Sequence, residues 1–197
     1  MRLDLLRHGT TGRNGHLDGR TDPPLSEAGW EQFRRQTRSG EWSRVVSSPL
    51  MRARAAADEY ARQAGCALQV DPDWSELHFG QWDGRKRSDI VSEPEQAALL
   101  DAFYADPLVA APGGESWADL QVRVSRAVDR ILATAEPAAV LVVTHGGAIR
   151  AALSHLLGWP LPQLWSLRIH PGTRLTLEAG HGPDGAPWAE IVEIIQP

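Results

Sequence analysis

The run AAVLVVT, Ala138–Thr144, constrains the fold of this chain more than any other stretch of its sequence. The run is apolar and rich in β-branched residues, and it shows no alternation of polar and apolar positions. Such a pattern is typical of a strand that is buried on both faces, as in a parallel sheet covered by helices. The chain is therefore predicted to belong to the α/β class.

The rest of the sequence alternates between strand and helix patterns and ends in strands. Strands are predicted at Arg2–Leu6, Arg44–Ser47 and Leu68–Val70, helices at Ser26–Gln36, Pro49–Ala64, Ser88–Tyr104 with a break at Pro94, Glu115–Thr134 and Gly147–Leu157, and antiparallel strands at Leu164–Ile169, Thr173–Glu178 and Trp188–Ile195. This order predicts a three-layer α/β/α architecture with a mainly parallel sheet flanked by helices. Because the 197 residues contain no stretch that resembles a linker, residues 1–197 are expected to form a single domain.

Composition and charge narrow the classes of partner. The net charge of -5 argues against a surface built to bind nucleic acid or anionic lipid. Cys66 is the only cysteine, which excludes a disulfide within the chain, and the longest uncharged apolar run, Pro137–Val143, is too short to span a membrane. We therefore expect a cytoplasmic protein whose partners include neither nucleic acid nor membrane. The sequence leaves open whether the chain forms a homodimer.

Reactive side chains follow three of the predicted strands. They belong to the tripeptides Arg7-His8-Gly9, Ser47-Ser48-Pro49 and Thr144-His145-Gly146. Because ligands bind at the carboxyl ends of the strands in such a sheet, the two histidines can face one cleft. Arg52, in the first turn of the next helix, can point to the same rim, and helix N-termini there favour a phosphate or carboxylate. These residues predict a pocket for a small dianion.

Four motifs occur in an order that resembles a known family. RHG followed by Asn14, then SSPLMRA, HFGQWDG and THGG are similar to the motifs of the histidine phosphatase superfamily, which includes phosphoglycerate mutases and phosphomonoester phosphatases. The resemblance implies a phosphoglycerate mutase-like fold, a small phosphomonoester substrate, and no metal ion or other cofactor. It implies the following site: His8 as the nucleophile that becomes a phosphohistidine, Arg7, Arg52 and His145 as ligands of the phosphoryl oxygens, Glu76 as the proton donor, and Asn14, Gly19 and Gly146 as substrate contacts.

The chemistry of phosphoryl transfer accounts for these residue types. A neutral imidazole is a good nucleophile, and neighbouring arginines disfavour the protonated form of His8. Arginine neutralises the phosphoryl oxygens through its planar guanidinium. The leaving alkoxide needs a proton, and Glu76, which stands between Trp74 and Phe79 in the sequence, is a carboxyl group in an apolar setting that can supply it.

Two of these assignments have rivals in the sequence. Glu115, in GGES, also matches a motif of the family and competes with Glu76 for the role of proton donor, although an acidic residue at a helix start can equally be a cap. Arg54 competes with Arg52 on the same predicted helix. The remaining histidines are expected to be surface or structural residues; they are His16, His78, His155, His170 and His181.

Two other classes of function compete with a phosphatase. GESWA, Gly114–Ala118, approaches the nucleophile motif of a serine hydrolase, and HGGA, His145–Ala148, approaches an oxyanion loop. That loop should precede its serine, however, and Ser116 follows no buried strand. A protein that only binds a phosphorylated ligand would need neither His8 nor Glu76. The sequence therefore favours a catalytic protein that uses both residues.

Within the superfamily, the sequence favours a phosphatase over a mutase. The segment Gly84–Gly113 is short, and beyond its RKR run, residues 85–87, it lacks the basic residues with which mutases resembling phosphoglycerate mutase hold their substrate. QWDG, GGESWADLQVRV and the stretch from Leu141 onward are most similar to the alpha-ribazole phosphatases, which remove a 5'-phosphate during assembly of the cobalamin nucleotide loop. Phosphatases of sugar phosphates or of phosphoglycerate share most of these residues and remain alternatives, as does phosphoglycerate mutase.

Overall fold

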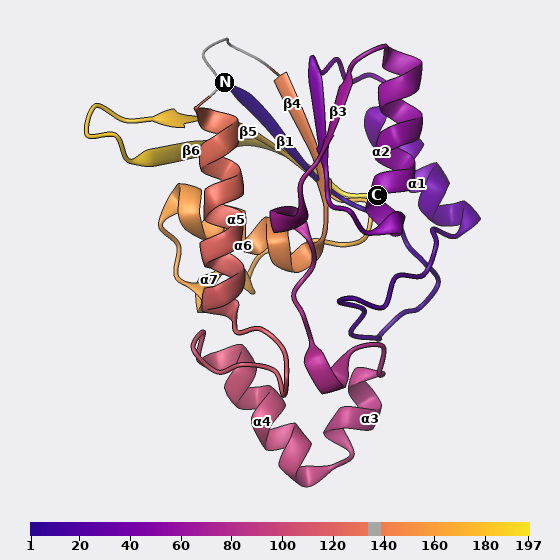
Figure 1. The fold of residues 1–197 in the computed structure, drawn as a ribbon, viewed down its shortest axis with the longest axis vertical. Coiled ribbons are helices and arrows are strands. Elements are labelled where there is room, and N and C mark those ends of the chain that lie inside the picture. The colour runs from indigo at the N-terminus through magenta and orange to yellow at the C-terminus, as the bar shows by residue number, and fades with distance from the viewer. Residues whose placement is uncertain (134–138) are drawn as a thin grey trace.

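Six strands of the computed structural model form one sheet in the order β3-β2-β4-β1-β5-β6 (Figure 1). The strands are β1 (Arg2–Arg7), β2 (Arg44–Ser47), β3 (Ala67–Val70), β4 (Ala139–Thr144), β5 (Arg174–His181) and β6 (Pro187–Ile195). The first four run parallel to one another, β5 is antiparallel to β1, and β6 is antiparallel to β5. The mainly parallel sheet with antiparallel strands at one side is therefore confirmed.

The structure describes residues 1–133 and 139–197. Two predicted element ends, Thr134 at the end of a helix and Ala138 at the start of β4, lie outside these ranges. From Val140 to Thr144, β4 is buried, as its run of β-branched residues predicts. The physical reason is its place in the sheet, since β4 has a strand on each side and helices over both faces.

The strand register brings two of the sequence motifs together. β1 and β4 are neighbours, with Arg7 opposite Thr144. Because the two strands are parallel and in register, the residues that follow them, His8 and His145, leave the sheet at the same edge. The carboxyl ends of the strands are where a sheet of this kind binds its ligands.

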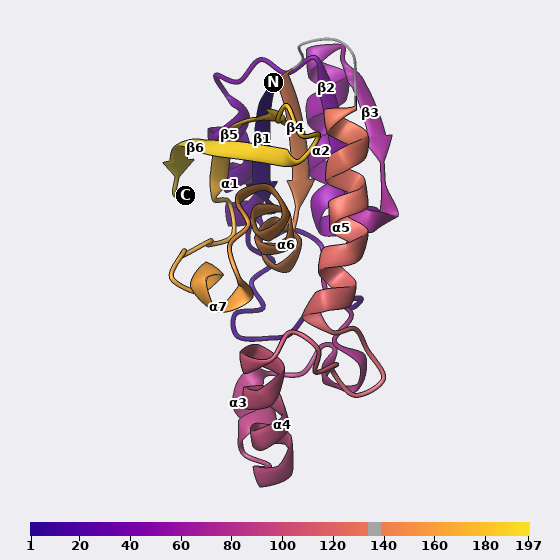
Figure 2. The ribbon, with the colours of Figure 1, turned by 90° about the vertical axis from the view of Figure 1, so that its left-hand side faces the viewer.

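Helices cover both faces of the sheet (Figure 2). They are α1 (Glu27–Thr37) and α2 (Met51–Ala64) on one face, and α5 (Trp117–Leu132) and α6 (Gly146–Leu157) on the other. Alternate side chains of β1 divide the core accordingly: Leu6 belongs to the apolar cluster that contains Phe33 of α1, whereas Leu5 belongs to the cluster of α5 and α6. The three-layer α/β/α architecture is confirmed.

Helix caps fix the chain near the sheet edge. The Ser26 side chain caps α1 by accepting from the Gly29 N–H, and Ser116 and Asp119 form a reciprocal capping box at the start of α5. The Ser116 hydroxyl therefore caps a helix and does not form part of a hydrolase nucleophile motif.

Within the described ranges, no helix combines the length and apolar character that crossing a membrane requires.

A lobe extends beyond the carboxyl ends of the strands and forms the lower part of Figures 1 and 2. It contains α3 (Arg87–Val91) and α4 (Pro94–Ala105), and the chain reaches it from β3 through two 3₁₀ turns, η1 (Pro72–Trp74) and η2 (Gly80–Trp82). The helix predicted over Ser88–Tyr104 is interrupted as expected, because Pro94 begins α4. The lobe packs Phe103 and Trp82 into the same apolar cluster as α5 and α6.

The strand predicted at Leu164–Ile169 is wrong. Residues Leu161–Leu164 form a short helix, α7, which starts after Pro160, and irregular backbone continues from there toward β5. Leu164 and Ile169 are nevertheless buried. Leu164 at the end of α7 and Ile169 in the irregular backbone after it both fill the core. A pattern of apolar side chains by itself does not distinguish such a segment from a strand.

Candidate active site

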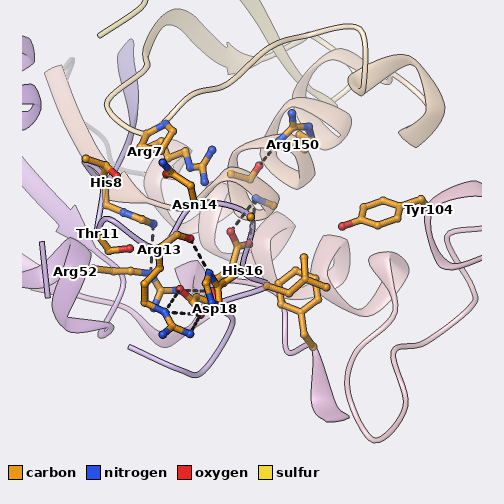
Figure 3. A pocket seen from close by; sticks show the side chains of 18 of the residues that line it. Arg7, His8, Thr11, Arg13, Asn14, His16, Asp18, Arg52, Tyr104 and Arg150 are labelled. Carbon is orange, nitrogen blue, oxygen red and sulfur yellow. Dashed lines mark hydrogen bonds and ion pairs between the residues drawn. The ribbon is translucent and has the colours of Figure 1, made fainter. Parts of the chain in front are cut away.

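A cavity of about 330 Å³ lies at the edge of the sheet where β1 and β4 end (Figure 3). Six of the eight predicted site residues line it: Arg7, His8, Asn14, Arg52, Glu76 and Gly146. The other two, Gly19 and His145, are buried behind this wall and contact Arg52 and His8, respectively. Asn14 is exposed on the loop that follows β1. The fold thus gathers the predicted residues from five separate parts of the sequence.

His8 follows β1 and is only 8% exposed. Its Nδ1 lies 2.7 Å from the Gly9 carbonyl oxygen, and its Nε2 lies 3.3 Å from the Arg52 Nε, which donates. Because a carbonyl oxygen only accepts, the proton of a neutral ring belongs on Nδ1, and Nε2 carries the lone pair. Burial holds the pKa of His8 well below its usual range, and the guanidiniums of Arg52 and Arg7 lower it further. The arginines act as predicted, but burial is the larger cause.

Arg52, in the first turn of α2, is 1% exposed and surrounded by acceptors. Besides His8, it donates to the backbone carbonyls of Thr21 (2.8 Å), Asp18 (2.8 Å) and Gly19 (3.0 Å) and to the Asp22 carboxylate (3.1 Å). These bonds fix the guanidinium beside the imidazole. Gly19 thus holds Arg52 through its carbonyl group, and a Cβ there would lie 2.3 Å from the Leu77 carbonyl oxygen.

Arg54, the rival of Arg52, is exposed and is not among the residues that line the cavity. The two residues differ by two positions on α2, which places them on different sides of the helix. The structure therefore places Arg52, and not Arg54, at the cavity, a choice that the sequence pattern left open.

His145 is completely buried and packs edge-on against His8, with the ring centroids 5.1 Å apart. Its Nε2 lies 2.7 Å from the Ser48 hydroxyl, and its Nδ1 has no hydrogen-bond partner within the described residues. Burial is the main cause that holds the pKa of His145 well below its usual range, and Arg52 adds to the effect. A neutral His145 therefore supports the His8 ring from behind.

Arg7 lines the cavity next to Gly146, the first residue of α6. Its Nη1 donates to the Ile169 carbonyl at 2.7 Å. Burial lowers the pKa of the Arg7 guanidinium, the Glu76 carboxylate opposes this, and Arg150 and Arg52 lower it further. A Cβ at Gly146 would lie 3.5 Å from the Arg7 guanidinium, an ordinary contact, so the N-terminus of α6 lies close to this cation.

Glu76 enters the cavity from the segment between η1 and η2. Its carboxylate accepts from the Gly147 N–H at 3.1 and 3.2 Å and from the Leu77 N–H at 2.9 Å. Unpaired N–H groups at a helix N-terminus favour such an anion. A Cβ at Gly147 would lie 2.3 Å from the Glu76 Oε1, so a side chain at this position would displace the carboxylate from where it lies now.

Glu115 does not line the cavity. It forms two hydrogen bonds with Arg123, 2.8 and 2.9 Å long, and accepts from the His78 N–H at 2.9 Å. Burial raises the pKa of Glu115, but Arg123 and the His78 N–H together hold it below its usual value. Arg123 also donates to the Glu76 carbonyl at 2.9 Å, so the Glu115–Arg123 pair fixes the segment that carries Glu76.

The side of the cavity away from His8 contains residues that sequence analysis did not assign to the site. They are Tyr104 of α4, Trp117 of α5, Arg150 of α6, and Trp165, which follows α7. Arg150 stands one helical turn after Gly146, a spacing that could have indicated its position. No sequence pattern indicated Tyr104, which reaches the cavity because the lobe with α3 and α4 packs beyond the carboxyl ends of the strands.

Within the ranges that the structure describes, no group of three or more His, Cys, Asp or Glu side chains is arranged to hold a metal ion. The charged groups of the cavity are arginines and carboxylates. The arrangement can bind a small dianion between guanidiniums, present a neutral imidazole to it, and place a carboxyl group nearby.

Comparison with known proteins agrees with this geometry. The chain belongs to the histidine phosphatase superfamily (branch 1), whose family model matches residues 3–184. This confirms the resemblance carried by the four motifs, together with the phosphoglycerate mutase-like fold.

Individual relatives fall within the same family. The bifunctional protein Rv2228c of Mycobacterium tuberculosis is 39% identical over 159 residues, which are 77% of this chain and 43% of that protein, so the chain spans less than half the length of this relative. The adenosylcobalamin/alpha-ribazole phosphatase of Salmonella typhimurium is 32% identical over 178 residues, 87% of each chain. The solved structure of mycobacterial glucosyl-3-phosphoglycerate phosphatase Rv2419c with VO3 has a TM-score of 0.85 and 29% identity, and the match covers 98% of this chain and 97% of that one.

Proposed function

We propose that this chain hydrolyses phosphomonoesters through a phosphohistidine on His8, without a metal ion. The observation that carries the proposal is the state of the His8 ring. The ring is buried, which holds its pKa well below the usual range; its Nδ1 is bound to the Gly9 carbonyl, and its Nε2 lies beside Arg52 at the wall of the cavity. An unprotonated ring nitrogen next to two guanidiniums is suited to attack a phosphoryl group whose charge those guanidiniums neutralise.

The proposed reaction has two steps. In the first, the His8 Nε2 forms a bond to phosphorus, the bond between phosphorus and the ester oxygen breaks, and Glu76 in its acid form gives a proton to the leaving oxygen. In the second, the Glu76 carboxylate takes a proton from water, the water oxygen forms a bond to phosphorus, and the bond between phosphorus and the His8 Nε2 breaks. Inorganic phosphate leaves, and neutral His8 is restored.

The assignment of the proton donor to Glu76 rather than Glu115 is supported by their surroundings. Glu76 lines the cavity and, among the residues that the structure describes, accepts hydrogen bonds from backbone N–H groups only. Glu115 lies outside the cavity and is paired with Arg123, which stabilises its charged form. A carboxylate held in an ion pair is a poor acid, whereas a carboxyl group at the cavity wall can reach the leaving oxygen.

The first substrate that we propose is alpha-ribazole 5'-phosphate. The support is the similarity of QWDG and GGESWADLQVRV to the alpha-ribazole phosphatases and the match over most of the chain to a relative of that name. The second candidate is a phosphoglycerate or sugar phosphate. The observation that favours it is Arg150 on the far side of the cavity, a cation where the alcohol part of the substrate would lie. A relative by structure is named for a phosphoglycerate ester.

The test is phosphate release in the presence of a chelator from alpha-ribazole 5'-phosphate, 3-phosphoglycerate, glycerol 3-phosphate and sugar phosphates. We expect the wild-type protein to release phosphate, to form an acid-labile phosphoenzyme, and to lose both properties in His8→Ala. His181→Ala, which removes an exposed histidine, is the matched control and should behave as wild type. Conversion of 3-phosphoglycerate to 2-phosphoglycerate without net release would instead indicate a mutase, and activity that persists in His8→Ala would overturn the mechanism.

A further inference from the structure

Asp83 belongs to the QWDG motif and takes part in no step of the proposed reaction. It follows η2, and its carboxylate accepts hydrogen bonds from three consecutive backbone N–H groups of the loop after β1. Oδ1 lies 3.2 Å from the Gly19 nitrogen and 3.0 Å from the Thr21 nitrogen, and Oδ2 lies 2.6 Å from the Arg20 nitrogen. Burial raises the pKa of Asp83, but the Thr21 and Arg20 N–H groups together hold it below its usual value, so the group that accepts these bonds is a carboxylate.

The same loop holds Arg52 through its carbonyl groups. The Arg52 Nη2 donates to the carbonyls of Asp18 and Gly19, at 2.8 and 3.0 Å. The Asp18 carbonyl and the Gly19 N–H belong to one peptide group, and the Gly19 carbonyl and the Arg20 N–H belong to the next. Each of these two planar peptide groups therefore donates to the Asp83 carboxylate and accepts from the Arg52 guanidinium.

A peptide group transmits the effect of the carboxylate to the guanidinium. Because the group is planar and its N–H and C=O point in opposite directions, fixing the N–H also fixes the direction of the carbonyl. The negative charge also polarises the peptide group, and hydrogen bonds in such a chain strengthen one another. Arg52 in turn donates from its Nε to the His8 Nε2 at 3.3 Å. The position of the guanidinium beside the imidazole therefore depends on two peptide groups that Asp83 orients.

Backbone pairing holds the two segments together independently of the Asp83 side chain. The Gly84 N–H donates to the Leu17 carbonyl, and the Leu17 N–H donates to the Arg85 carbonyl, both at 2.9 Å. A change in the Asp83 carboxylate therefore removes acceptors from the loop after β1 while these bonds keep the segments adjacent. This separation makes a role of the carboxylate testable.

We propose that Asp83 is a positioning residue for the phosphatase reaction, which fixes the Arg52 guanidinium beside His8 through the peptide groups of residues 18–20. This inference rests on the proposed function, because it concerns the same site. Asp83 does not line the cavity, so it acts on the reaction through Arg52 and not by contact with the substrate.

The first test observes the Arg52 guanidinium directly, by NMR of protein with isotopically labelled arginine. The Nε–H signal of Arg52 is assigned by its loss in Arg52→Lys. Asp83→Asn replaces one acceptor oxygen by an NH₂ group, which cannot accept from a backbone N–H. We expect hydrogen exchange at the Arg52 Nε–H to become faster by about tenfold or more, the factor that corresponds to loss of one hydrogen bond to a charged group.

Arg123 provides the internal control. It is also buried, and its Nε donates to the Glu115 carboxylate, which does not contact Asp83. Exchange at the Arg123 Nε–H should be the same in the wild-type protein and in Asp83→Asn, and this signal also shows that the variant is folded. Asp101→Asn removes an exposed carboxylate from α4 and should leave both signals as in wild type.

The second test is calorimetric titration with inorganic phosphate. Asp83→Asn should weaken phosphate binding by about tenfold, for the same reason, whereas Asp101→Asn should not change it. Asp83→Glu keeps the charge and both acceptor oxygens and should restore part of the affinity. If Asp83→Asn does not fold, Asp83→Glu takes its place in both tests, with a smaller loss expected than for a missing acceptor.

Three results would overturn the positioning role. They are wild-type exchange at the Arg52 Nε–H in the folded variant, wild-type phosphate affinity in that variant, and exchange that becomes faster at Arg123 as much as at Arg52. Loss of the phosphatase proposal looks different: no ester, p-nitrophenyl phosphate included, would release phosphate in a His8-dependent way, while the Arg52 signal would still respond to Asp83→Asn.

Discussion

The two ends of the cavity hold their cations in different ways. At the end that contains His8, Arg52 is fixed by backbone carbonyls and by the Asp22 carboxylate. At the opposite end, Arg150 is fixed by two carbonyls and an aromatic face; burial lowers the pKa of its guanidinium, and the Glu76 carboxylate opposes this. The guanidinium beside the imidazole is therefore held by more hydrogen bonds than the guanidinium at the opposite end of the cavity.

The largest effect is expected when the His8 end loses its cation. Arg52→Ala removes the donor to the His8 Nε2 and leaves the Asp22 carboxylate without its ion pair. We expect kcat to fall by about 10²- to 10³-fold, as for the loss of one donor to a transition state, and phosphate binding to weaken as well. The measurement is steady-state kinetics with p-nitrophenyl phosphate together with calorimetric titration of phosphate.

Arg54→Ala is the control for this prediction, because Arg54 is exposed on the same helix. It should leave both measurements within about twofold of wild type, since surface substitutions away from a site have small effects. If Arg54→Ala impaired turnover as strongly as Arg52→Ala, the assignment of the cation to Arg52 would be wrong.

A smaller and more selective effect is expected at Glu76. Glu76→Gln keeps the size of the side chain but cannot give a proton to the leaving oxygen. For alkyl phosphates we expect a loss of about 10²-fold or more, because general acid catalysis contributes about 10²- to 10⁴-fold. For p-nitrophenyl phosphate, whose leaving group needs no proton, the loss should be less than about tenfold by the same reasoning. The ratio of the two losses is the measurement.

Glu115→Gln sharpens the same comparison. Since Glu115 acts through Arg123 on the segment that carries Glu76, its loss should affect both substrate classes by a similar factor. A larger loss for alkyl than for aryl phosphates in Glu115→Gln, with equal losses in Glu76→Gln, would exchange the two roles.

The contrast between the two ends also explains what the sequence could predict. His8, Arg7 and Gly146 lie next to strand ends, and strand ends can be recognised from local patterns such as the β-branched run of β4. Because ligand sites follow from strand ends in a parallel sheet, this half of the site could be derived without a structure.

Tertiary packing decides the remaining features. Tyr104 reaches the cavity from a lobe whose orientation no local pattern encodes. Gly19 and His145 were predicted as contacts of the substrate, but both lie behind the wall, where they hold Arg52 and the His8 ring. A sequence motif indicates that such residues belong to a site, but it does not distinguish residues that line the cavity from residues that hold the lining residues in place. The irregular backbone after α7 was predicted as a strand for a similar reason, because its apolar alternation reports burial and not hydrogen bonding.

The smallest effect is expected in the free energy of unfolding, which should depend on pH through the two buried imidazoles at the His8 end of the cavity. Burial keeps the pKa of both His8 and His145 well below the usual value, so below pH about 6.5 the unfolded chain binds protons that the folded chain does not. Stability is therefore full above that pH and falls as the pH decreases, by up to about 1.4 kcal/mol per pH unit for each histidine. Urea unfolding at pH 7.5, 6.5 and 5.5 measures the slope. We expect His8→Asn to reduce the slope by about half, since one of the two protons is then absent from the balance, and His181→Asn to leave it as in wild type. A slope that is the same in wild type and His8→Asn would mean that His8 takes up its proton in the folded state, and it would remove the physical basis for a neutral nucleophile.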